Sequence, residues 1–251
     1  MSDFVLIAHR GFSSKAPENT VAAFDLAFNS GFTNIELDVQ LTADGTPVVI
    51  HDGTVDRTTN GIGSVASMTY AQLAELDAGS WFDRSFEGEK VPSLEAVLGR
   101  YAGKIHLHLE LKSEQPDLAQ NVAALLRRCR WLDGLQDAPF AVPGLTITSK
   151  YPEQLDRSLK LLQAVSHHWL TWDLNEHIME TAITKGFKGL GIEPKAAKPD
   201  LVKRAQNKGL TVRGLFAKSD DDIRAFIAAG VEGTTTNWPD RGEAVKKELA
   251  V

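Results

Sequence analysis

Short, β-rich apolar runs alternate with amphipathic stretches along almost the whole chain, and this alternation restricts the fold more than any other feature. Repeated strand and helix units build parallel sheets, because a parallel neighbour can be reached only through a long crossover connection. Strands are predicted near residues 4–8, 34–39, 47–51, 105–111, 144–148, 164–169, 188–192, 211–216 and 232–236. These nine candidates are one more than a closed (β/α)8 barrel needs.

Turn chemistry removes the extra strand. Only "ADG" separates "NIELDVQLT" from "TPVVIHD", and so short a connection joins antiparallel neighbours. The run 47–51 is therefore predicted to be a hairpin arm folded over the barrel mouth. We expect an α/β fold, a (β/α)8 barrel that forms a single domain over residues 1–251, although two small domains would also fit this length. Asn19 and Thr20 are both predicted as N-cap residues of the first helix, and Gly31 is expected to stop it.

Residues 52–104 interrupt the alternation with several glycines, several aromatic residues and one short helix-like stretch, "TYAQLAELD". The segment is too long for a simple loop, so it is predicted to be an inserted subdomain after the second-strand hairpin. Its aromatic residues Trp81, Phe82 and Phe86 either pack the insertion against the barrel or form an apolar entrance, and we favour packing.

Bulk properties exclude several classes of protein. The net charge of -6 gives no reason to expect a nucleic acid partner, and the single cysteine, Cys129, rules out an internal disulfide. The apolar stretch in "MSDFVLIAHRG" is too short for a signal-peptide core, and no segment is long enough to cross a membrane. A cytoplasmic protein without stable membrane insertion is expected, while the oligomeric state is left open, a homo-oligomer included.

Polar residues gather where the predicted strands end, which is where barrel enzymes carry their chemistry. Glu36 and Asp38 lie two apart on one strand and so face the same side, and Glu110 ends a neighbouring strand. Three carboxylates in one lumen repel one another unless a cation lies among them. Oxygen ligands suit a hard ion, so one Mg²⁺ or Ca²⁺ is predicted to bind Glu36, Asp38 and Glu110.

Two histidines and two basic residues flank these carboxylates. His9 and Arg10 end the first strand, His51 ends the hairpin arm, and Lys112 follows Glu110 by two. Arg10 and Lys112 fit an anionic phosphate ester as substrate. Cleavage of a phosphodiester requires a base for the attacking oxygen and an acid for the departing alkoxide, and His9 and His51 are predicted to fill these two roles.

The strand that ends in Glu110 and Lys112, "IHLHLELK", also carries His106 and His108. Such a pair of histidines on a barrel strand is a zinc-hydrolase signature. Both lie below Glu110, towards the lower end of the strand, so a supporting role is favoured over metal ligation. His108 is expected to contact a carboxylate. Of the adjacent His167 and His168, at most one can face the lumen. Glu18 is a candidate for shaping the site.

Several blocks together resemble the glycerophosphodiester phosphodiesterase family. They are "AHRG", "PENTVAAF", "IELDVQLTADGTPVVIHD", "RTTNGIG", "DAGSWF", "VPSLEAVL" and "LELK", in family order and with family spacing, between residues 5 and 112. The resemblance implies a TIM barrel with an inserted subdomain, a divalent metal, and hydrolysis of a small-molecule glycerophosphodiester to glycerol 3-phosphate and an alcohol. It also implies catalysis by His9 and His51, metal binding by Glu36, Asp38 and Glu110, and phosphate binding by Arg10 and Lys112. In a mechanism proposed for such enzymes, the glycerol 2-hydroxyl attacks phosphorus and water opens the cyclic product.

Three positions depart from the family pattern, all at or beside strand ends. Leu215 stands where a tryptophan is usual, Lys150 where a phenylalanine is usual, and Asn237 where an aspartate is usual. Phe216, Trp169 or Trp172 would have to supply the apolar wall. Because of these departures, the sequence does not define which alcohol is released. A lysophospholipase D-like lipid phosphodiesterase and a phosphate-ester-binding barrel without turnover therefore stay as alternatives.

Overall fold

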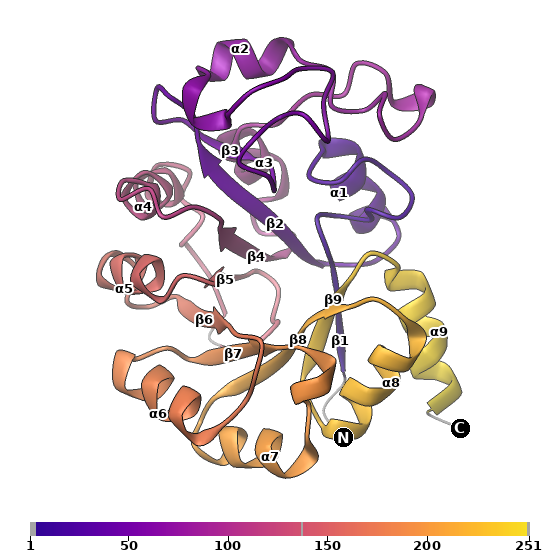
Figure 1. Ribbon diagram of the computed structural model, residues 1–251, viewed down its shortest axis with the longest axis vertical. Helices are drawn as coiled ribbons and strands as arrows, with labels where there is room; N and C mark the ends of the chain where they lie inside the picture. The colour runs from indigo at the N-terminus through magenta and orange to yellow at the C-terminus, as the bar shows by residue number, and fades with distance from the viewer. Residues whose placement is uncertain (1–3, 137, 250–251) are drawn as a thin grey trace.

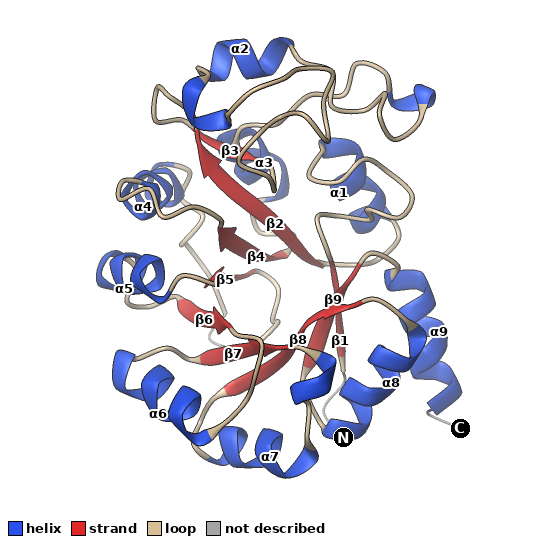
Figure 2. Ribbon diagram, viewed as in Figure 1, coloured by secondary structure: helices blue, strands red, loops and turns tan. Residues whose placement is uncertain are grey.

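The computed structural model describes residues 4–136 and 138–249. Eight parallel strands close into a barrel with helices around it (Figures 1 and 2). In sheet order the barrel strands are β1 (Val5–Ala8), β9 (Gly233–Thr236), β8 (Thr211–Ala217), β7 (Gly189–Ile192), β6 (Ser166–Leu170), β5 (Gly144–Ser149), β4 (His106–Leu111) and β2 (Asn34–Leu41). Pairing of Ala8 with Ile35 closes the ring. The predicted (β/α)8 barrel is confirmed.

The hairpin arm is β3 (Pro47–Val49), which pairs antiparallel with the outer half of β2. Val39 faces Val49 in this register, and Leu41 faces Pro47. Since β2 runs beyond the barrel wall to meet β3, the hairpin carries His51 over the carboxyl ends of the barrel strands. The prediction of eight barrel strands and one hairpin arm is correct.

The outer helices cover the barrel with their apolar faces. They are α1 (Val21–Asn29), α3 (Leu94–Tyr101), α4 (Leu118–Arg128), α5 (Pro152–Leu161), α6 (Glu176–Lys185), α7 (Pro199–Asn207), α8 (Asp220–Ala229) and α9 (Pro239–Leu249), with a 3-10 turn η3 (Pro194–Ala196) before α7. The outward-facing Leu107, Leu109 and Leu111 of β4 join the buried core that these helices form with the sheet. Alternation on β4 therefore sends leucine to the helices and polar residues to the lumen.

The segment 52–104 falls into two packing environments. Val48, Ile50, Val55, Leu73 and Val91 belong to a small second core, to which α2 (Tyr70–Glu75) and η1 (Val65–Ser67) contribute. The segment also contains η2 (Arg84–Phe86), and α2 lies at one end of the molecule (Figure 1). The buried residues of α3, in contrast, belong to the main barrel core. We therefore propose that the inserted subdomain ends near Val91 and that α3 is a barrel helix.

The barrel lumen contains a layer of buried histidines below the strand ends. The rings of His106 and His108 stack with centroids 4.5 Å apart, and His106 contacts the carbonyl oxygen of Ala141 and the hydroxyl of Thr146. His108 contacts the amide oxygen of Asn34 at 3.1 Å rather than a carboxylate, so the expected carboxylate contact of His108 is wrong. Outside the lumen, His167 contacts the Ser158 hydroxyl of α5 at 2.9 Å.

Buried histidines predict a loss of stability in mild acid. Burial lowers the pKa of His106 and of His167 to about 4, so these rings stay neutral in the folded protein while an unfolded chain takes up protons below pH 6.5. Each ring should therefore remove about 1.4 kcal/mol of stability per pH unit as the pH falls from 6.5 towards 4. Urea unfolding at several pH values measures this slope.

The matched variants separate buried from exposed histidines. His167→Asn should make the slope shallower, whereas His177→Asn on the exposed side of α6 should leave it unchanged. A free energy of unfolding that stays constant between pH 6.5 and 4 would contradict this prediction.

Candidate active site

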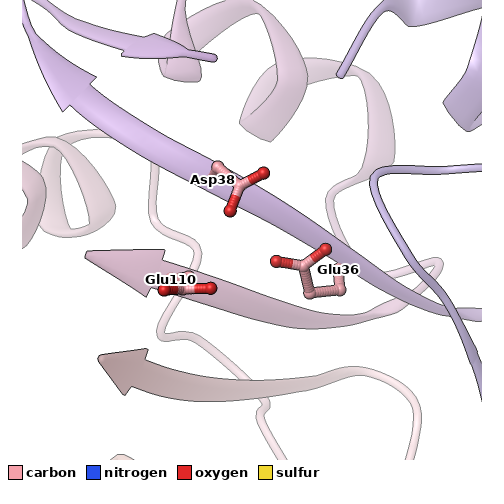
Figure 3. Close-up of side chains that lie close together, drawn as sticks. All are labelled: Glu36, Asp38 and Glu110. Atoms are coloured by element: carbon pink, nitrogen blue, oxygen red, sulfur yellow. The ribbon is translucent and has the colours of Figure 1, made fainter. Parts of the chain in front are cut away.

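Glu36, Asp38 and Glu110 converge in the lumen from two neighbouring strands (Figure 3). The register of β2 and β4 pairs Asp38 with Glu110. Each of the three side chains offers an oxygen, and these atoms lie within 4.8 Å of one another. All three side chains are almost completely buried. The sequence placed two of them on one face of a strand, and the register brings the third beside them.

Two basic side chains hold Asp38 ionised. Arg10 Nε lies 3.0 Å and Lys112 Nζ 3.6 Å from its carboxylate. Burial alone would raise the pKa of Asp38, but Arg10 and then Lys112 hold it well below its ordinary value. Lys112 Nζ also contacts Glu110 at 2.9 Å, and the backbone N–H of Arg10 donates to Glu36 at 2.9 Å. Arg10 and Lys112 therefore lie at the carboxylates as expected.

The cluster of Glu36, Asp38 and Glu110 fits a divalent cation. Burial, and next the charges of Asp38 and Glu110, raise the pKa of Glu36 well above its ordinary value. Burial likewise raises the pKa of Glu110. The buried Oδ1 atom of Asp38 has no hydrogen-bond partner. Crowded carboxylates and a buried oxygen without a hydrogen bond are what a hard cation would satisfy.

His9 lies against the carboxylates, with its side chain 14% exposed. Its Nδ1 lies 2.7 Å from Oδ1 of Asn237, its Nε2 lies 3.9 Å from Glu36, and its ring packs on Phe216 with centroids 4.5 Å apart. Burial, with a smaller contribution from Arg10, lowers the pKa of His9 to about 3. Asn237, one of the departures from the family pattern, is therefore the neutral partner of this histidine.

His51 lies across the pocket in a different environment. Its Nδ1 contacts Oδ1 of Asp52 at 2.6 Å, and its side chain is 30% exposed. Because the carboxylate accepts the proton on Nδ1, Nε2 is the ring nitrogen left to reach a substrate. The two histidines thus differ in charge environment, since His9 contacts an amide and His51 contacts a carboxylate.

These groups border one pocket of about 810 Å³ at the carboxyl ends of the barrel strands. The polar part of its lining includes His9, Arg10, Glu36, His51, Glu110 and Lys112. The lining also contains Leu170, Trp172, Leu215 and Phe216, together with Lys150 and Asn237. Asp38 lies behind this lining, against Arg10. Of the residues predicted to supply the apolar wall, Phe216 and Trp172 line the pocket and Trp169 does not, and Leu215 lines it as well.

Asn19 has a different role from the one expected. Thr20, not Asn19, caps α1 through its side-chain contact with the backbone N–H of Ala23. The Asn19 amide donates to Oδ2 of Asp38 at 2.8 Å, and its oxygen accepts the backbone N–H of Asp38. The capping assignment of Asn19 is wrong, because the left-handed backbone of Asn19 (φ 58°) turns its side chain towards the site.

Asp52, Arg57 and Arg213 also belong to the site, and none of the three was predicted from the sequence. Asp52 directly follows His51, which is a local signal, whereas Arg57 reaches the site only through the folded insertion. Arg213 is 1% exposed on β8 and lines the pocket, and its Nε and Nη1 atoms lack hydrogen-bond partners. An arginine at a lumen-facing strand position was the available signal for it.

The aromatic residues of the insertion are not part of the pocket lining described above. Trp81, Phe82 and Phe86 instead contact one another edge to face, with centroids 5.8 Å and 5.7 Å apart. The three rings therefore pack within the insertion, and among the described residues they belong neither to the barrel core nor to the pocket lining. Among the described residues, no helix has both the length and the apolar character of a membrane span.

A tight turn after β1 fixes His9 and Arg10, and its glycine gives a stability prediction. Gly11 has φ 80°, and a Cβ there would lie 2.6 Å from the carbonyl carbon of Ala23. Gly11→Ala should lower the free energy of unfolding by roughly 2–4 kcal/mol, since it combines left-handed strain with a clash against backbone. Urea unfolding measures the change, and Gly103→Ala, which has φ 73° but open space, isolates the strain alone. Equal losses in both variants would contradict the clash.

Comparison with known proteins identifies the family. The model of the glycerophosphoryl diester phosphodiesterase family matches residues 9–241. The chain is 56% identical to the YhdW protein of Bacillus subtilis over 241 residues, which cover 94% of this chain and 95% of that protein. It is 32% identical to a glycerophosphodiester phosphodiesterase of the same organism, with 96% of this chain and 86% of that protein covered.

Solved structures agree with the fold. A glycerophosphodiester phosphodiesterase from Agrobacterium tumefaciens has a TM-score of 0.80 at 30% identity, with 96% and 99% of the two chains covered. An Oleispira antarctica phosphodiesterase in complex with the product sn-glycerol-3-phosphate has a TM-score of 0.85 at 26% identity, with 97% and 96% covered. The chain therefore belongs to the glycerophosphoryl diester phosphodiesterase family, a family of phosphoric diester hydrolases.

Proposed function

We propose that this protein hydrolyses glycerophosphodiesters to sn-glycerol 3-phosphate and an alcohol by acid-base catalysis with His9 and His51. The observation that carries the proposal is the convergence of both histidines, the carboxylate cluster and two basic side chains on one pocket. The product bound to the Oleispira antarctica relative supports glycerol 3-phosphate as the retained half of the substrate.

Arg10 and Lys112 would bind the phosphoryl oxygens of the substrate, since both ammonium and guanidinium groups lie at the edge of the carboxylate cluster. Glu36, Asp38 and Glu110 would hold one divalent cation, which supplies Lewis-acid stabilisation of the charge on the phosphoryl group. With the divalent ion bound, the positive charges of the ion, Arg10 and Lys112 would exceed the negative charges of the three carboxylates. A pocket with this net positive charge suits a phosphodiester monoanion.

The partners of the two histidines support different roles for them. His9 is neutral and lies beside an amide, so we assign it the base that takes the proton of the attacking oxygen. His51 contacts the Asp52 carboxylate, which would offset the charge of a protonated ring, so we assign it the acid. As the new oxygen-phosphorus bond forms, the bond to the leaving alcohol breaks and the alkoxide takes its proton from His51.

A lipid substrate is the second candidate, and one observation favours it. Trp172 lines the pocket and is 56% exposed, beside Leu170 and Leu215, so the pocket has an apolar rim. A lysophospholipase D would use such a rim for an acyl chain. We also propose that the protein acts in the cytoplasm with one Mg²⁺ or Ca²⁺ ion.

A substrate panel tests the proposal. The purified protein would be incubated with glycerophosphocholine, glycerophosphoethanolamine, glycerophosphoglycerol and lysophosphatidylcholine, each with Mg²⁺ or Ca²⁺. Release of glycerol 3-phosphate from the first three and little choline from the lysolipid is the expected result. Faster cleavage of the lysolipid would contradict the proposal and indicate a lysophospholipase D-like enzyme. No turnover of any ester would indicate a phosphate-ester-binding protein without catalytic activity.

A further inference from the structure

One guanidinium in the insertion joins two carboxylates beside the active site. Arg57 Nε donates to Oδ2 of Asp52 at 2.6 Å, and its Nη1 and Nη2 donate to the two oxygens of Glu18 at 2.9 Å and 2.8 Å. All three nitrogens of the side chain are therefore used. A lysine has no comparable planar set of donors, so this arrangement depends on arginine.

Both carboxylates, those of Asp52 and Glu18, also contact groups of the active site. Asp52 contacts Nδ1 of His51 through its other oxygen, at 2.6 Å. Glu18 accepts from Nη1 of Arg10 at 2.8 Å, and Arg10 in turn contacts Asp38. We call these five residues the Arg57 network: Arg10, Glu18, His51, Asp52 and Arg57. A single side chain of the insertion thus connects the histidine assigned as acid with the arginine assigned to phosphate.

The exposure of Arg57 indicates what the network is for. Its side chain is 45% exposed, and ion pairs with exposed partners contribute little to folding stability. The forked contact with Glu18, in contrast, fixes geometry. His51 is itself 30% exposed and lies just beyond the end of β3, so its ring depends on Asp52 for orientation. Small displacements of a catalytic group are costly for rate.

We propose that Arg57 is a positioning residue, which acts through Asp52 to keep Nε2 of His51 directed at the leaving alcohol and through Glu18 to hold Arg10. The inference rests on the proposed function of the pocket. It adds that the insertion completes the active site, because the only side chain joining Asp52 to Glu18 among the described residues comes from residue 57.

The test compares two leaving groups in Arg57→Met. Choline leaves as a poor alkoxide that needs a proton from His51, whereas p-nitrophenolate leaves without one. The kcat for glycerophosphocholine divided by the kcat for the p-nitrophenyl ester of glycerol 3-phosphate is expected to fall at least tenfold. This ratio cancels losses common to both esters, including weaker phosphate binding by Arg10 and a smaller folded fraction. An unchanged ratio would overturn the proposal.

A matched arginine and a spectroscopic measurement complete the design. Arg84 lies in the same insertion and is 96% exposed, and within residues 4–136 and 138–249 its one ion pair is with Glu87, at 3.9 Å, so Arg84→Met should leave the ratio at the wild-type value. The acid form of His51 carries protons on both ring nitrogens, so the tautomer is read from the deprotonated ring at high pH: the imidazole ¹⁵N shifts should show Nδ1–H in the wild type, held by Asp52, and a mixture in Arg57→Met. An unchanged tautomer would overturn the positioning role. Since this spectrum needs no turnover, a wild-type protein inactive on both esters would reject the proposed function separately.

Discussion

Replacing His51 or His9 with alanine is expected to lower kcat for glycerophosphocholine about 10²- to 10⁴-fold in either variant. His9→Ala removes the neutral ring beside Glu36 and Asn237, so the attacking oxygen loses its base. His51→Ala removes the ring held by Asp52, so the alkoxide loses its acid. Steady-state kinetics with a saturating divalent ion measures both effects.

The two variants should also differ from each other. His51→Ala should retain more activity on the p-nitrophenyl ester than on the choline ester, because p-nitrophenolate needs no proton, whereas His9→Ala should lose both. His177→Ala, on the exposed surface of α6, is the control and should behave as the wild type. Near wild-type turnover of the choline ester by either site variant would remove that histidine from the mechanism.

The second large effect concerns the cation. Glu36→Gln keeps the shape of the side chain but removes one of three charges within 4.8 Å, and should weaken Mg²⁺ or Ca²⁺ binding at least tenfold, about 1.4 kcal/mol or more. Turnover should fall with it. Calorimetric titration of metal-free protein measures the affinity, and Glu87→Gln in the insertion, 66% exposed, is the matched control.

The same substitution has a second, opposite consequence for stability. Burial and the charges of Asp38 and Glu110 raise the pKa of Glu36, so the folded metal-free protein destabilises its carboxylate relative to the unfolded chain. Glu36→Gln should therefore leave the metal-free Tm unchanged or raise it. Wild-type metal affinity in this variant, or a metal-free Tm well below the wild type, would contradict the assignment of Glu36.

The parts of this site that lie on strands could be predicted from the sequence, and the reason is geometric. A period of two places Glu36 with Asp38, and Glu110 with His108, whatever the rest of the chain does. The three-residue connection "ADG" likewise forced a hairpin and so left eight barrel strands. Local rules of this kind do not require knowledge of long-range contacts.

Side chains on loops could not be assigned in the same way. Asn19 is a good capping residue by type, yet its contact with Asp38 depends on a left-handed backbone that no periodic pattern reveals. Arg57 is 39 positions away from Glu18, and only the folded insertion brings them together. Hydropathy also could not divide residues 52–104, because α3 and the insertion are both amphipathic and differ only in which core they cover.

The central claim is that this pocket cleaves the phosphodiester on the alcohol side, and ³¹P NMR of a reaction with glycerophosphocholine and Mg²⁺ or Ca²⁺ tests it most directly. The diester resonance should be replaced by that of sn-glycerol 3-phosphate, and excess EDTA should stop the conversion. A diester signal that persists with metal present, or replacement by phosphocholine, would contradict the account.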